Sequence, residues 1–308
     1  MNPLMAVGVD AGGTSTVAAL SRDGMYVAEV HEGPGNASTL GAEAAAAAVV
    51  STVSQFREEP HALFVAAAGA GRPEVRSALQ AALARRFPSA RIEVEDDTRA
   101  ALRAGHPVGS GIVLLAGTGS VAYAESGERR VRVGGAGYLL GDEGSGFWIG
   151  LAAARLLERA YAGRTPPDET TAFVAGALGA PDRDALLAVV YPQPFDVARV
   201  AALAPKIVEL AGCGNRNATK IVQSAAQELG DLVRSAARSS DLVEESPTVV
   251  FAGGLLRGNT LLSYLLENRV ASEIPGASIV RFREEPARAA LRFAEHLCDG
   301  TNANSGAS

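Results

Sequence analysis

Two short turns that combine glycine with hydroxyl side chains are the part of this sequence most suited to chemistry. In the first, an apolar run over residues 4–9 ends at Asp10, and residues 16–20 are apolar again. The turn between them consists of Gly12, Gly13, Thr14 and Ser15. Backbone N–H groups and hydroxyls in such a hairpin turn can bind an anion, and a carboxylate lies at the end of the first strand. The pattern is typical of a phosphate-binding turn.

The second turn repeats the same chemistry in the middle of the chain. It follows the apolar run 111–116, precedes another apolar stretch, and consists of Gly117, Thr118, Gly119 and Ser120. A single glycine-rich turn often does no more than reverse the chain. Two turns of one type predict two walls around one polyphosphate.

Neither turn fits the two commonest nucleotide motifs. A P-loop needs a lysine beside the turn, and the lysines of this chain, Lys206 and Lys220, are far from both. A dinucleotide fingerprint opens a helix, whereas each of these turns leads into a further strand pattern. We therefore expect backbone dipoles, hydroxyls and a metal ion to balance the phosphate charge.

Two acidic segments add candidate catalytic groups. In residues 94–101 a strand pattern ends at Asp96 and Asp97 and a helix pattern begins. Taken alone, such an aspartate is more typical of a helix N-cap than of a catalytic group. In residues 134–146, six of the thirteen residues are glycine, and Asp142 lies just before an amphipathic helix pattern over 147–161. This density of glycine favours close approach to a ligand over a flexible linker.

The elements that must position these groups fall into two similar series. The first has strand patterns at 4–9, 16–20, 26–31, 62–67 and 92–95, with helices over 39–56, 73–86 and from about 98. The second has strands at 111–116, 120–124, 130–134, 248–252 and 279–282, a helical region over 143–240 and a last helix over 286–297. Proline pairs at 166–167 and 192–194 indicate loops inside the helical region. The repeated order predicts a structural duplication with a mixed sheet in each half.

Composition excludes several other classes. With 308 residues, of which 47% are hydrophobic, the chain can form two lobes. A net charge of −6 without a basic cluster argues against nucleic acid as a partner. No apolar run is long enough to span a membrane, and the N-terminus does not resemble a secretory signal, so we expect a cytoplasmic protein that does not bind membranes. Cys213, Cys298 and the four histidines show no metal-ligand spacing.

Taken in order, these motifs carry a family resemblance that extends over residues 5–297. The chain resembles the N-acetylglucosamine kinase branch of the sugar kinase, Hsp70 and actin superfamily. It is also similar to the BadF/BadG/BcrA/BcrD ATPase family, which includes activators of 2-hydroxyacyl-CoA dehydratases. The segments that carry the resemblance are Asp10-x-Gly-Gly-Thr, Gly33-Pro-Gly-Asn, Asp96-Asp97, Gly117-Thr-Gly-Ser, Gly141-Asp-Glu-Gly-Ser and Gly253-Gly254.

The resemblance implies an α/β fold of two ribonuclease H-like (actin-like ATPase) lobes with a nucleotide cleft between them. The first lobe would span residues 1–110. The second would span 111–298 with a helical insertion, its last helix being free to pack on the first lobe. Residues 299–308 are expected to form a disordered tail. Related kinases also imply a homodimer.

The resemblance further implies a role for each candidate residue. ATP phosphates would lie between the two turns, and adenosine would lie beside Gly253 and Gly254. Asp10 would hold Mg²⁺, which prefers oxygen ligands. Asn36, Asp97 and Asp142 would contact a sugar, with Asp97 as the catalytic base. We also expect the lobes to close over the sugar, because closure would exclude competing water.

The function implied is ATP-dependent phosphorylation of an amino sugar or hexose, above all N-acetylglucosamine or glucosamine at the 6-hydroxyl. The alternative is an activator ATPase of the 2-hydroxyacyl-CoA dehydratase type, which needs cysteines for an iron–sulfur cluster; the surroundings of Cys213 and Cys298 do not resemble that site. A sugar-responsive repressor would need an added DNA-binding segment, for which the N-terminus leaves no room. Ala136, where related kinases often have a bulky residue, and Asp96, where asparagine is common, leave the choice of sugar open.

Overall fold

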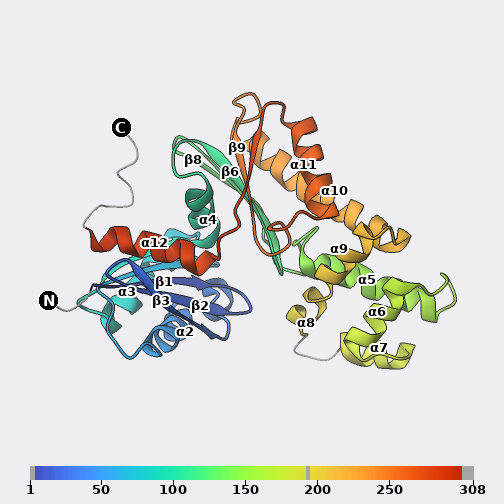
Figure 1. Cartoon of the computed structure of the whole chain (residues 1–308), viewed down its shortest axis with the longest axis horizontal. Helices are drawn as coiled ribbons and strands as arrows, with labels where there is room; N and C mark the ends of the chain where they lie inside the picture. Colours follow the sequence, from blue (N-terminus) through green and yellow to red (C-terminus); the bar gives the residue numbers. More distant parts are fainter. Residues whose placement is uncertain (1–3, 192–194, 300–308) are drawn as a thin grey trace. The chain divides into compact units, whose positions relative to one another are not determined.

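The computed structural model describes residues 4–191 and 195–299, which divide into two compact units. The first unit contains the described residues up to Gly109 and those from Arg283 onward. The second unit contains the described residues from Ser110 to Phe282. Figure 1 labels the elements of both units. The expected tail at 300–308 and the loop at 192–194 lie outside the described residues.

The first unit is built on a five-stranded mixed sheet with the strand order β3-β2-β1-β4-β5. Its strands are β1 (Met5–Ala11), β2 (Thr16–Arg22), β3 (Met25–Glu32), β4 (Ala62–Ala67) and β5 (Arg91–Asp96). Its helices are α1 (Ala37–Leu40), α2 (Ala42–Ser54), α3 (Pro73–Arg86), α4 (Asp97–Gly105) and α12 (Pro286–Cys298). Strands β1, β2 and β3 pair antiparallel, whereas β1, β4 and β5 are parallel.

Both faces of this sheet are covered, which explains why every residue of β4 is buried. Helices α2 and α3 pack on one face, and α12 packs on β1, β2 and β4 on the other (Figure 1). The approach of α12 is close at Gly8, where a β-carbon would lie less than 3.0 Å from backbone atoms of Ala290 and Leu291. The last helix of the chain therefore completes the core of the first unit.

The second unit repeats the same topology with the strand order β10-β9-β6-β7-β8. Its strands are β6 (Gly111–Ala116), β7 (Ser120–Ser126), β8 (Arg129–Gly134), β9 (Thr248–Ala252) and β10 (Ser278–Arg281). Its helices are α5 (Gly146–Tyr161), α6 (Glu169–Leu178), α7 (Arg183–Val190), α8 (Val197–Ala201), α9 (Ala204–Gly212), α10 (Arg216–Ser239) and α11 (Leu261–Glu273). Read from β8 inward, the order matches that of the first sheet, so the predicted duplication and the α/β class are confirmed.

One helical prediction was wrong, and another was confirmed. The single helix predicted over 39–56 is divided into α1 and α2 at Gly41, whose φ of 80° is outside the helical range. The helical region predicted over 143–240 contains, among its described residues, the six helices from α5 to α10. In the part of the chain that the structure describes, we find no helix with the length and apolar character of a membrane span.

The close approach at Gly8 predicts a sharp cost for any side chain there. We expect Gly8→Ala to lower the free energy of unfolding by about 2 kcal/mol or more, because the added methyl must displace the α12 backbone. As a control, Gly176→Ala in α6 meets no atom within 4 Å. That change should raise stability by about 0.5–1 kcal/mol. Urea unfolding of the two variants checks both signs, and equal stability of Gly8→Ala and wild type would contradict the packing described for α12.

Candidate active site

The first glycine-rich turn joins β1 to β2, as the sequence predicts. The Gly12 N–H donates to the Ser15 carbonyl at 2.8 Å, which closes the turn and leaves Gly13 and Thr14 exposed at its tip. Asp10 is half-buried near the end of β1, where it pairs in register with Val17 of β2. A carboxylate oxygen thus stands at the base of a turn whose tip is open to solvent.

The segment that contains Asn36 is held against this turn. The Gly35 N–H donates to the Gly12 carbonyl at 2.9 Å. A β-carbon on Gly35 would lie closer than 3.0 Å to Thr16 Oγ1, so only glycine fits this contact. Asn36 follows directly, with its Nδ2 atom 4.0 Å from the position of a β-carbon on Gly13. Asn36, the candidate sugar contact, and the first glycine-rich turn are therefore neighbours within the first unit.

Asn36 also has a structural task that limits its chemistry. Its Oδ1 atom accepts hydrogen bonds from the Ser38 backbone N–H and hydroxyl, both at 2.8 Å, and from the Thr39 N–H at 3.4 Å. The side chain thus caps α1, as asparagine often does. With the oxygen engaged in this way, the amide nitrogen is the part of Asn36 suited to donate to a ligand.

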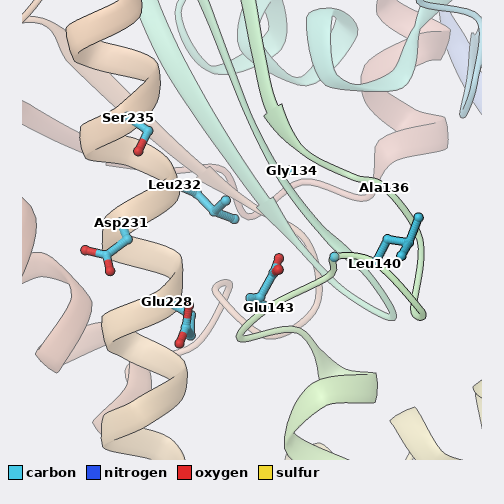
Figure 2. Close-up of a pocket in the computed structure, with 9 residues that line it drawn as sticks. Gly134, Ala136, Leu140, Glu143, Glu228, Asp231, Leu232 and Ser235 are labelled. Atoms are coloured by element: carbon cyan, nitrogen blue, oxygen red, sulfur yellow. The ribbon is translucent and has the colours of Figure 1, made fainter.

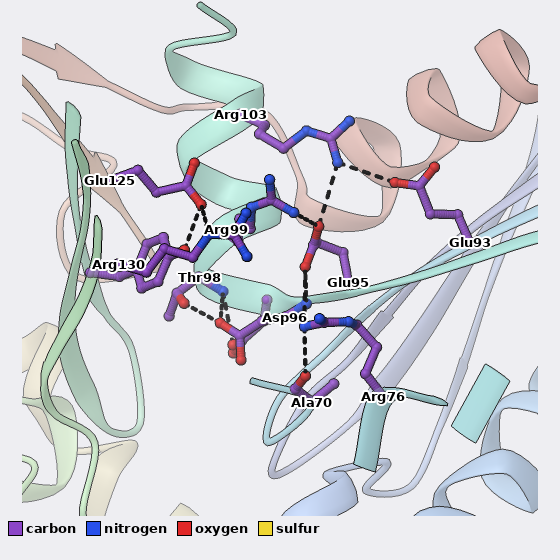
Figure 3. A network of polar contacts seen from close by, with 12 residues as sticks. Ala70, Arg76, Glu93, Glu95, Asp96, Thr98, Arg99, Arg103, Glu125 and Arg130 are labelled. Carbon is purple, nitrogen blue, oxygen red and sulfur yellow. Dashed lines mark hydrogen bonds and ion pairs between the residues drawn. The ribbon is translucent and has the colours of Figure 1, made fainter. Parts of the chain in front are cut away.

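Two consecutive aspartates, Asp96 and Asp97, stand at the start of α4. Asp96 is buried, and its Oδ1 atom accepts hydrogen bonds from the Thr98 N–H at 3.1 Å and from the Thr98 hydroxyl. Asp96 is therefore the N-cap of α4, and it is labelled in Figure 3. Asp97 is the first residue of the helix and is half-buried. The N-cap of α4 is Asp96. The Asp97 Oδ1 atom also accepts a hydrogen bond from the Thr98 N–H, at 2.8 Å, and Asp97 remains the candidate for chemistry.

Parallel strand register brings these groups to one edge of the first sheet. Asp10 pairs with Ala66 of β4, and Ala66 pairs in turn with Glu95 of β5. Because the carboxyl ends of neighbouring parallel strands meet at the same edge, Asp10 and Asp97 belong to that edge. Ligands of open α/β sheets bind outside this edge.

The second turn joins β6 to β7 and is held by the start of α5. The Gly117 N–H donates to the Gly119 carbonyl at 2.9 Å. Two N–H groups of α5 donate back to the turn, from Gly146 to the Gly117 carbonyl at 2.8 Å and from Phe147 to the Thr118 carbonyl at 3.1 Å. The turn is fixed by the backbone of a neighbouring helix.

Gly253 and Gly254 lie beside the strand that leads into this second turn. At Gly253, φ is +90° and a β-carbon would lie closer than 3.0 Å to the backbone of Ala116. The Leu255 N–H then donates to the Ala116 carbonyl at 3.2 Å. Within the second unit, the predicted adenosine and phosphate residues are therefore adjacent. A β-carbon on Gly254 would meet no atom within 4 Å.

Asp142 lies against the second turn. Its backbone φ is +58°, and its Oδ1 atom accepts a hydrogen bond from the Ser120 N–H at 3.2 Å. A β-carbon on Gly119 would lie 2.8 Å from the same oxygen. Burial raises the pKa of Asp142 above its ordinary value, and the Glu143 charge adds to the rise. The Ser120 hydrogen bond and the Arg132 charge oppose it.

A pocket of about 390 Å³ opens beside the glycine-rich loop that carries Asp142 (Figure 2). On one side it is lined by Ala136 and Leu140, and on the other by helix α10. The residues of α10 that line it are Glu228, Asp231, Leu232 and Ser235. None of these four residues was predicted from the sequence to line a pocket. Their i, i+3, i+4 and i+7 spacing shows that they share a helix face, but it does not show what that face meets.

The contact at Gly35 predicts that a methyl group would separate the Asn36 segment from the first turn. We expect Gly35→Ala to increase amide hydrogen exchange in residues 10–16 and 33–40 by about tenfold or more, because the hydrogen bond to Gly12 is lost. The control is Gly33→Ala, which meets no atom within 4 Å and has no positive φ. Equal protection in the two variants would contradict the proximity described here.

Asp142 predicts a pH-dependent cost to stability. Since its pKa is raised from 3.8 in the folded state, the folded state binds more protons than the unfolded state just above pH 3.8. Its contribution to stability is therefore lost as the pH rises through the folded pKa. Asp142→Asn keeps an oxygen acceptor for Ser120 and should raise Tm by about 1–3 °C at pH 7. The gain should shrink toward pH 4, whereas the exposed control Glu244→Gln should show no such trend.

Comparison with known proteins places this chain in a family. A sequence profile of the BadF/BadG/BcrA/BcrD ATPase family matches residues 7–292. The N-acetylmuramic acid/N-acetylglucosamine kinase of Clostridium acetobutylicum is 25% identical over 302 residues, which cover 95% of this chain and 99% of that protein. The glucosamine kinase GspK of Vibrio cholerae is 28% identical over 234 residues, covering 72% and 77%.

A solved structure supports the fold. A chain from Chromobacterium violaceum, provisionally named an N-acetylglucosamine kinase, matches with a TM-score of 0.72 and 24% identity and covers 94% of this chain and 99% of that one. Because the family profile extends over nearly all of the sequence, this protein belongs to the BadF/BadG/BcrA/BcrD ATPase family.

Proposed function

We propose that this protein is an ATP-dependent kinase that phosphorylates an amino sugar, N-acetylglucosamine or glucosamine, at the 6-hydroxyl. The observation that carries the proposal is the place of Asp97, which begins α4 directly after the capping residue Asp96 and is half-buried at the carboxyl edge of the sheet. The same edge carries Asp10, and the turn that follows Asp10 contacts the Asn36 segment. Membership of an ATPase family and the sugar kinases among the relatives support this reaction.

Asp97 is the proposed catalytic base. A sugar hydroxyl is a poor nucleophile, so a carboxylate within hydrogen-bond reach must orient it and accept its proton. The sugar oxygen then bonds to the γ-phosphorus, the bond from that phosphorus to the bridging oxygen of ADP breaks, and the proton moves to the Asp97 carboxylate. Asp97 lies at the N-terminus of α4, where the helix dipole attracts negative charge.

Asn36 of the first unit and Asp142 of the second are the proposed further sugar contacts. Because the Asn36 oxygen caps α1, we assign its amide nitrogen as a donor to a sugar oxygen. Asp142 would accept hydrogen bonds from sugar hydroxyls. Its raised pKa indicates that burial disfavours its charge when no ligand is bound. Sugar hydroxyls would compensate part of that cost.

Phosphate binding is assigned to the two turns, Gly12–Ser15 and Gly117–Ser120, through backbone N–H groups and hydroxyls. Gly253 and Gly254 are the proposed adenosine residues. Among the described residues, no group of three or more acidic, histidine or cysteine side chains could hold a metal alone. A single carboxylate such as Asp10 fits Mg²⁺, which is commonly bound by one or two carboxylates together with substrate phosphates. When bound, Mg²⁺ would offset the negative charge on the transferring phosphoryl group.

The cysteines do not favour the alternative, a dehydratase activator. Such an activator would use them to hold an iron–sulfur cluster across a dimer interface. Cys213 is exposed after α9 in the second unit, whereas Cys298 ends α12 in the first. The homodimer implied by related kinases remains part of the proposal and can be tested by light scattering.

The proposal predicts sugar-dependent ADP formation that requires Asp97. The assay supplies Mg–ATP with glucose, glucosamine, N-acetylglucosamine, N-acetylmannosamine or N-acetylmuramic acid. Asp97→Asn should lower kcat by about 10²- to 10⁴-fold, because loss of a general base removes an effect of that size. The matched control is Asp96→Asn, which keeps the cap because asparagine and aspartate cap helices about equally well. It should retain kcat within about threefold.

Two outcomes would contradict this proposal. ATP hydrolysis that no sugar changes would favour the activator ATPase. Equal loss of activity in Asp96→Asn and Asp97→Asn would show that the integrity of α4, not a base, is what the reaction needs.

A further inference from the structure

A buried glutamate lies two residues before the proposed base. Glu95 is the next-to-last residue of β5, and its side chain is 6% exposed. Three arginines surround it, and none is more than 28% exposed. Figure 3 shows Arg99 and Arg103 reaching Glu95 from α4 and Arg76 reaching it from α3. Burying a charged carboxylate without partners costs free energy of folding, so the Glu95 side chain depends on these arginines.

The two oxygens of Glu95 make different connections. Oε2 forms an ion pair with Arg99 and lies 3.7 Å from the Arg103 guanidinium, so it attaches to α4 twice. Oε1 accepts a hydrogen bond from the backbone N–H of Asp96 at 3.1 Å and lies 3.8 Å from Arg76. Oε2 thus connects β5 to two arginines of α4, and Oε1 contacts the backbone at the junction between β5 and α4.

Arg76 extends the connection toward the next strand end. Its guanidinium donates to the Ala70 carbonyl at 3.4 Å, just after β4. Ala68, in the same segment, donates from its N–H to the Ala11 carbonyl and accepts from the Ala37 N–H, each at 2.9 Å. The segment that follows β4 therefore contacts the end of β1 and the first residue of the helix capped by Asn36.

The charges around Glu95 are unequal. Glu93, on the same face of β5, pairs with Arg103 at 3.2 Å, so two carboxylates face three guanidinium groups. The Arg103 guanidinium also lies 4.8 Å from the centre of the Phe293 ring of α12. Removal of the Glu95 charge would take away one of these two carboxylates, and α4 would lose the ion pairs that Arg99 and Arg103 make with Glu95.

We propose that Glu95 is a positioning residue for Asp97, holding the first turn of α4 at the orientation that phosphoryl transfer requires. Asp97 is the first residue of α4, Arg99 follows two residues later, and Arg103 lies about one turn beyond Arg99; both arginines reach Glu95. Glu95 touches neither substrate in this scheme. The inference rests on the proposed function, because it assumes that Asp97 is the base.

The test begins with Glu95→Gln, which keeps the size of the side chain but has one acceptor oxygen in place of two. We expect kcat for the preferred sugar to fall about 10- to 100-fold, the range expected when a reacting group is displaced by about 1 Å. The KM for ATP should change less than about twofold, because the phosphate turns are untouched. The matched control is Glu93→Gln on the same strand and face, which should keep kcat within about twofold.

A double-variant cycle separates positioning from a general loss of structure. If Glu95 acts through Asp97, Glu95→Gln should lower the residual kcat of Asp97→Asn by less than about threefold, although it lowers wild-type kcat far more. Equal factors in the two backgrounds would overturn the inference. Unchanged kcat in Glu95→Gln would also overturn it and would leave the proposed function intact. Absence of sugar-dependent turnover in the wild type would overturn both.

A second variant covers the case in which Glu95→Gln fails to fold. Arg76→Gln removes one of the two partners of Oε1, the more exposed one, and leaves the Asp96 N–H and both arginines of α4 in place. It should lower kcat by less than Glu95→Gln does, because only one contact of Glu95 is lost, and this loss should likewise disappear in the Asp97→Asn background. A loss from Arg76→Gln that is the same in both backgrounds would overturn the inference.

Discussion

The parallel register of β1, β4 and β5 is the constraint on which the rest of the candidate site depends. Backbone hydrogen bonds along these strands fix where each strand ends. Asp10 and the first turn lie at the end of β1, and Asp97 follows the end of β5. Apolar side chains on both faces of the sheet make a shift of register costly, because a shift by one residue would turn each side chain to the opposite face. The second unit uses the same topology for its own turn and its own glycine pair. The candidate site residues are therefore carried by backbone whose position is fixed by packing of the core.

Several candidate residues also complete the local fold. Asn36 caps α1, Asp142 accepts the Ser120 N–H at a left-handed position, and Asp96 caps the helix that begins with Asp97. Such contacts restrict the side-chain rotamers before any ligand arrives, which lowers the entropy cost of binding. Because these side chains serve both the local fold and the candidate site, a conservative change at one of them would affect folding and binding together.

Much of this arrangement could be predicted from the sequence. The positions of the strands along the chain, both turns and the acidic segment before α4 follow from local patterns of apolar and turn residues. The spatial order of the strands was not predicted. The assignment of the cap to Asp96 could not be made, because either aspartate suits an N-cap. Nor could the arginine partners of Glu95, since Arg76 is separated from it in sequence and meets it only through packing. The division of the first helix at Gly41 was missed because an alanine-rich pattern hides one residue of positive φ.

The return of α12 to the first unit has a consequence for synthesis. Gly8 contacts Leu291, so the core that includes Phe64 and Ala66 stays open until almost the whole chain has left the ribosome. Contacts between residues so far apart in sequence close slowly, because a long loop must be ordered first. During translation the first unit therefore presents an apolar sheet face to the cell, while the second can complete its core from one continuous stretch of chain. The core of the first unit is therefore completed only after α12 has been synthesised.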